Sequence, residues 1–177
     1  MRARTWTVRV GGITREELRG QLDTAGIRRN PYAELLLADP VFDVRAAETV
    51  ELVERSVADL GLTGGGTLAE VHAAAEANGL ALCPPDTAPY LRLMWLDQEI
   101  APDSILSTGR APTASLQVAT RVLRADDDYP KGFYLRVIDG EPWLRGFRCD
   151  EEYVAAPEDR LVFRVPSRSA FDSTARS

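Results

Sequence analysis

The sequence predicts an α+β fold in which two strand-helix units, related as a pseudo-repeat, are followed by an antiparallel β-meander. The pseudo-repeat rests on two stretches of matching spacing, which open with Thr-x-x-Glu at Thr14 and Thr67 and end at Gly26 and Gly79. The meander rests on the alternation of polar and apolar residues through the C-terminal half. With 177 residues and 45% apolar content, we expect one globular domain over residues 1–166 and a flexible tail over residues 167–177.

Both repeated stretches carry the signals of a capped helix. In each Thr-x-x-Glu box the hydroxyl and the carboxylate satisfy the first free backbone amides of a helix. The closing glycine suits the left-handed conformation of a C-terminal cap. We therefore expect one helix over about residues 15–25 and another between Thr67 and Gly79.

Local patterns predict the other elements of the first half. Alternation, proline positions and β-branched content indicate strands over residues 5–10, 48–57 and 89–96, a short helix after Pro31 and a loop over 97–112. Residues 48–57 also suit a helix, and the strand is favoured because it repeats the strand-then-helix order.

The second half reads as strands separated by turns. Alternating or apolar runs predict strands over residues 115–123, 132–138, 142–148 and 161–165. Three consecutive aspartates, Asp126 to Asp128, indicate a solvated turn between the first two of these strands.

Asp139-Gly140 is the strongest short-range signal for a β-hairpin, because it lies between two alternating runs. A type I′ turn needs positive φ at both central residues, which Asp and Gly tolerate. A two-residue turn there fixes a register in which Ile138 faces Glu141. That register sorts the side chains onto two faces. One is a core face with Phe133, Leu135, Val137 and Leu144; the other carries Tyr134, Arg136, Trp143, Arg145 and Phe147.

The second face of this hairpin is the candidate site for binding a protein partner. Guanidinium groups lie opposite aromatic rings there, which favours cation–π contacts. Trp, Tyr and Arg are also the residues that dominate binding hot spots. We therefore expect a non-catalytic binding module, while an ordinary solvated face, in which Arg136 and Arg145 merely cover the rings, remains the alternative.

A different function is a small enzyme or a small-molecule-binding protein with a cleft between the helical units and the sheet. The residues that would line this cleft are Arg92, Asp97, Glu99 and Lys131. Carboxylates and a lysine carry out acid–base chemistry when they converge and burial shifts their pKa values. Whether the chain is an enzyme is left open by the sequence.

No cofactor or metal site is predicted. The single histidine, His72, shares a helix face with Glu76 and lacks the further ligands of a metal site. The glycine-rich run at residues 63–67 lacks the lysine of a phosphate loop, and residues 126–128 are out of register with an EF-hand.

Charge and hydropathy indicate which classes of partner the protein binds and in which compartment it is located. The 27 acidic and 21 basic residues give a net charge of −6, which opposes binding to nucleic acid or to anionic membranes. No apolar stretch reaches the roughly 20 residues that cross a bilayer, and residues 5–10 alternate where a signal peptide would be apolar. Cys83 and Cys149 are far apart and expected to be reduced. The expected location is the cytoplasm.

Several short segments extend this interpretation: LGLTGGGTLAE at 60–70, LCP, YLRL and LDQ between 82 and 98, and KGFYLR and WLRG between 131 and 146. On these residues the chain resembles, loosely over residues 13–165, a group of small uncharacterised bacterial proteins. Some members carry the label "helicase", which does not suit this chain because it has neither a phosphate loop nor room for paired motor domains. The resemblance implies one compact bacterial domain and no catalytic residues.

Overall fold

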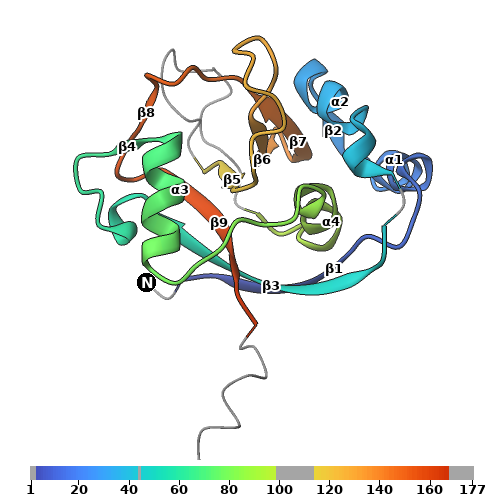
Figure 1. The fold of residues 1–177 in the computed structure, drawn as a ribbon. Helices are drawn as coiled ribbons and strands as arrows, with labels where there is room; N and C mark the ends of the chain where they lie inside the picture. The colour runs from blue at the N-terminus through green and yellow to red at the C-terminus, as the bar shows by residue number, and fades with distance from the viewer. Residues whose placement is uncertain (1–2, 44, 99–113, 168–177) are drawn as a thin grey trace, which may run out of the picture.

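The computed structural model describes residues 3–43, 45–98 and 114–167. A seven-stranded sheet with the order β1-β3-β9-β5-β6-β7-β2 curls around helix α4, while α2 lies beside β7 and α1 contacts α4 (Figure 1). The strands are β1 (Thr5–Val10), β2 (Arg28–Arg29), β3 (Glu48–Ser56), β5 (Leu116–Val118), β6 (Gly132–Ile138), β7 (Glu141–Phe147) and β9 (Arg160–Val165). A second, two-stranded sheet pairs β4 (Gly66–Thr67) with β8 (Val154–Ala155).

Four α-helices and two short 3-10 helices complete the described part of the chain. They are α1 (Arg15–Thr24), α2 (Pro31–Leu37), α3 (Leu68–Ala77), α4 (Thr87–Met94), η1 (Pro40–Phe42) and η2 (Ala58–Leu60). No helix in the described ranges is both long enough and apolar enough to span a bilayer. Apart from its first residue, the predicted tail over 167–177 lies outside the described residues.

The mixed α+β class is confirmed, but the predicted order of two units followed by a meander is wrong. The last strand, β9, pairs antiparallel with β3 on one side and parallel with β5 on the other. It therefore joins the N-terminal strands to the C-terminal hairpin in one curled sheet. Local alternation predicts strands but carries no information on which distant strands pair, and this is why the topology was missed.

The two capping boxes form as predicted. The Thr14 and Thr67 hydroxyls accept from the amides of Glu17 and Glu70, at 3.0 and 3.2 Å, and the two carboxylates accept in return from the threonine amides. The helices nevertheless pack in different cores. Helix α1 packs in the core that contains Val162, and α3 packs in the core that contains Phe163, so the repeat is one of helix capping and the units are not a symmetric pair.

Residues 89–96 form most of helix α4 and not the strand that the sequence predicted. Pro89 lies in the first turn, where a missing N–H costs nothing. Ala88, Leu91 and Trp95 are buried at helical spacing, and the helix contacts β1, β6 and β7. The apolar run is thus a helix surrounded by the sheet, a case in which periodicity alone does not separate helix from strand.

The hairpin has the predicted register over its whole length, from Ile138 opposite Glu141 to Phe133 opposite Gly146. Asp139 and Gly140 have φ values of 52° and 77°, as a type I′ turn requires. The predicted strand over 48–57 is also confirmed, as β3, whereas the strand over 115–123 shortens to the three residues of β5.

The edge of the hairpin is closed by a side chain. Asn30 begins helix α2 by accepting from the Ala33 amide at 2.9 Å. The same side chain accepts from the Gly146 amide at 2.8 Å and donates to the Gly146 carbonyl at 3.0 Å, as a neighbouring strand would. A Cβ atom on Gly146 would lie 2.6 Å from the Tyr32 carbonyl carbon, so only glycine lets α2 approach this closely.

Candidate functional site

The five predicted binding residues lie on one face of the β6–β7 hairpin. Tyr134 pairs with Arg145 and Arg136 pairs with Trp143, while the alternate residues Leu135 and Leu144 lie in the core on the other face. The division of the hairpin into two faces is therefore as predicted.

This face is less exposed than the sequence suggested. Tyr134 and Arg136 are only 8% and 1% exposed, which corrects the expectation of a fully solvated face. Trp143, Arg145 and Phe147 are half-buried. Any partner that binds here would first meet these three residues.

Cation–π contacts join the residues that remain accessible. The Arg145 guanidinium lies 4.9 Å from the Trp143 ring centre and 6.0 Å from that of Tyr134, and its Nε donates to the Tyr134 hydroxyl at 2.8 Å. The guanidinium of Arg28, from β2, lies 5.9 Å from the centre of the same Trp143 ring and forms an ion pair with Glu141 at 2.7 Å. We call the set Arg28, Glu141, Trp143, Arg145 and Phe147 the Trp143 surface.

Sequence reasoning missed Arg28. It reaches the hairpin because β2 pairs parallel with β7, with Arg28 opposite Trp143. A strand of two residues has too little alternation to be recognised in a sequence, so no local signal would have found this contact.

A buried arginine supports the backbone beneath the Trp143 surface. Arg92 of α4 is fully buried; its Nη1 lies 3.5 Å from the carbonyl oxygens of Arg136 and Trp143 and 2.7 Å from Gln98 Oε1. Its Nη2 donates to the Trp95 carbonyl. Burial lowers the pKa of Arg92 to about 10, because the charged guanidinium loses its hydration.

The residues that were predicted to line a cleft lie at separate places in the fold and form separate contacts. Lys131 is 8% exposed, and its Nζ donates to the Arg124 and Asp126 carbonyls at 2.8 and 2.5 Å. Arg92 binds the neutral groups described above, Asp97 is exposed, and Glu99 lies outside the described residues. No hydrogen bond or ion pair within the described part of the chain joins Arg92, Asp97 and Lys131.

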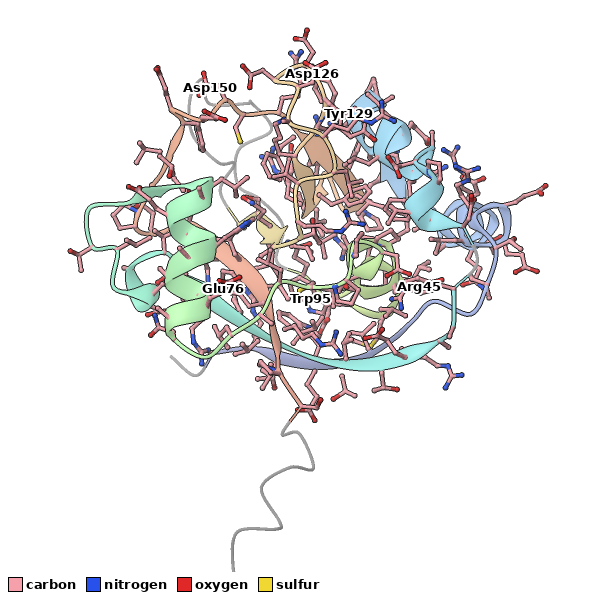
Figure 2. The ribbon with its side chains drawn as sticks, viewed as in Figure 1. Arg45, Glu76, Trp95, Asp126, Tyr129 and Asp150 are labelled. Carbon is pink, nitrogen blue, oxygen red and sulfur yellow. The ribbon has the colours of Figure 1, made fainter. Side chains whose placement is uncertain are left out.

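An open acidic hollow of about 630 Å³ lies elsewhere, lined by Ala125, Asp126, Asp127, Asp150, Glu151 and Glu152. Asp126 and Asp150 are found at the same end of the molecule, at the top of Figure 2. The Asp126 carboxylate accepts from the Asp128 amide at 2.9 Å, which fits the predicted turn. Over the residues that the structure describes, no group of three His, Cys, Asp or Glu side chains is arranged to hold a metal ion.

Burial shifts the pKa values of the histidine and of both cysteines. The Nε2 atom of His72 is buried without a hydrogen-bond partner, and desolvation lowers the pKa of this imidazole although the charge of Glu76 opposes the shift. Cys83 and Cys149 are free, and burial raises the pKa of both thiols. Neutral thiols of raised pKa are poor nucleophiles, so the structure gives neither cysteine the activation of a catalytic thiolate.

Comparisons with family models, with curated proteins and with solved structures gave no match. The resemblance to small bacterial proteins therefore rests on the sequence segments quoted above.

Proposed function

We propose that the protein is a non-catalytic binding module that recognises a protein partner through the Trp143 surface. The observation that carries the proposal is the half-buried Trp143 ring, which contacts the guanidinium groups of both Arg28 and Arg145. Tryptophan and arginine are enriched in binding hot spots, and the tryptophan ring buries a large apolar area.

Support for a preformed site comes from the backbone beneath it. The carbonyl of Trp143 lies against the Arg92 guanidinium, and the neighbouring Gly146 is fixed on both its N–H and its C=O by Asn30. A rigid site loses less entropy on binding than a mobile one. Two free cysteines suit a reducing compartment, which supports the bacterial cytoplasm as the proposed location.

The test is affinity capture from cells of the native host with the full chain as bait, followed by mass spectrometry. The variant carries Trp143→Ala and Arg145→Ala, and the matched control carries Asp126→Asn and Asp127→Asn in the acidic hollow. We expect a reproducible partner that the wild type and the control retain and the double variant loses, with all three baits giving the same circular dichroism spectrum.

A partner retained equally by the double variant would contradict the proposal, as would one lost only with the control. A second variant, Trp143→Phe, guards against a general loss of packing because it keeps an aromatic ring. It should retain more partner than the double variant does.

A further inference from the structure

We infer that the Trp143 surface binds an acidic peptide segment, meaning an extended stretch of the partner protein that carries aspartate or glutamate side chains. This inference rests on the proposed function and names the chemistry of the partner. It follows from the charges, the hydrogen-bond donors and the aromatic rings of the surface.

The two arginines of this surface differ in how their charges are paired. Arg28 is already neutralised by Glu141, with Nε–Oε2 and Nη2–Oε1 distances of 2.7 and 3.1 Å. Arg145 forms no ion pair with a described residue, and its Nε donates to the neutral Tyr134 hydroxyl. Its two terminal nitrogens thus remain for a ligand, and a guanidinium fork matches a carboxylate in bidentate geometry.

The indole of Trp143 has a hydrogen-bond donor to offer a ligand. Its Nε1–H is covered and has no acceptor. A buried donor without a partner costs roughly 1–3 kcal/mol. A bound segment that displaces whatever covers this N–H can supply its acceptor, such as a backbone carbonyl. Part of the cost carried by the free protein is then recovered on binding.

The charge of the protein favours a peptide over a nucleic acid as the ligand of this surface. Both carry anionic groups, but a nucleic acid presents a continuous run of phosphates. The protein has a net charge of −6 and a hollow with five carboxylates, which repel a long polyanion. A peptide need place only one or two carboxylates at Arg145 and can lay its remaining side chains on the rings of Trp143 and Phe147.

The experiment is a titration of the ¹⁵N-labelled full chain, followed through the indole N–H signals of its three tryptophans. Trp143→Phe assigns the signal of Trp143 by its disappearance. The probe is a short peptide of alternating glutamate and serine, and the matched probe has glutamine in place of glutamate. An oligothymidylate of similar length is the nucleic-acid arm.

We expect the glutamate peptide to shift the Trp143 signal, to leave those of Trp6 and Trp95 in place, and to bind more weakly as salt is raised. Arg145→Gln should weaken binding about tenfold or more, the loss of one charge-assisted contact. Arg9→Gln, on the exposed side of β1, is the matched control and should leave the affinity unchanged.

The inference is overturned if the Trp143 signal does not move, if the glutamine peptide moves it equally, or if oligothymidylate binds more tightly than the glutamate peptide. These failures are distinct from failure of the proposed function. A partner that is lost in the capture experiment with the Trp143 and Arg145 double variant would still establish the surface, even where the glutamate peptide does not bind.

Discussion

Replacing Asn30 with alanine tests how the hairpin is held against helix α2. The substitution removes the N-cap of α2, a change that costs about 1 kcal/mol, and also leaves the N–H and C=O of the buried Gly146 without partners. Each backbone group that is left without a hydrogen-bond partner costs roughly 1–3 kcal/mol when water cannot reach it. We expect a total loss of about 3–7 kcal/mol in the free energy of unfolding, or roughly 6–28 °C in Tm for a chain of this size.

The assay is urea unfolding followed by tryptophan fluorescence and by circular dichroism, with thermal melts as a second measure. Thr14→Ala is the matched control, because it removes the exposed cap of α1 and no strand-like contact, and it should cost only about 1 kcal/mol. Asn30→Asp keeps the two hydrogen bonds that the side-chain oxygen accepts, from the Ala33 and Gly146 amides, but loses the donor to the Gly146 carbonyl. Its stability should therefore lie between those of wild type and Asn30→Ala. If Asn30→Ala costs no more than Thr14→Ala, the reasoning is wrong.

Three further outcomes are expected. Gly146→Ala should lose about 1–3 kcal/mol in urea unfolding because its Cβ meets the α2 backbone, whereas Gly20→Ala, with open space around it, should be neutral or stabilising. Burial raises the pKa of Glu54, but hydrogen bonds from Arg4 and Arg160 outweigh it and leave the pKa lowered; Glu54→Gln should therefore be less stable than wild type at pH 7, with the gap closing as the pH falls below about 4.3. Burial lowers the pKa of His72, so acid favours the unfolded state: wild type should lose stability relative to His72→Gln from about pH 6.5 downward, and an unchanged difference between pH 7.5 and 5.5 would refute this.

The features that the sequence predicted well are those decided by neighbours in the chain. The capping boxes at Thr14 and Thr67 and the turn at Asp139-Gly140 each depend on residues within a few positions, and all three form. The hairpin register followed from the turn, and with it the division of residues between two faces.

The features that were missed depend on distant contacts. The run from Pro89 to Leu96 is apolar enough for a strand or a helix, and the space inside the curled sheet favours the helix. Arg28 joined the candidate site through a strand of two residues, and the low exposure of Arg136 could not be foreseen from its place in an alternating run. Alternation gives the face on which a side chain lies but does not say what covers that face.

The place of β9 in the sheet sets a condition on how the chain can fold. Strands β1 and β3 pair with each other, and β5, β6 and β7 form a second group, but β9 alone lies between the two groups. During synthesis the sheet cannot close until residues 160–165 have left the ribosome, so β3 and β5 each keep an open edge until then. Closure then requires pairing across most of the chain, which slows folding and makes the last strand the one that completes the whole sheet.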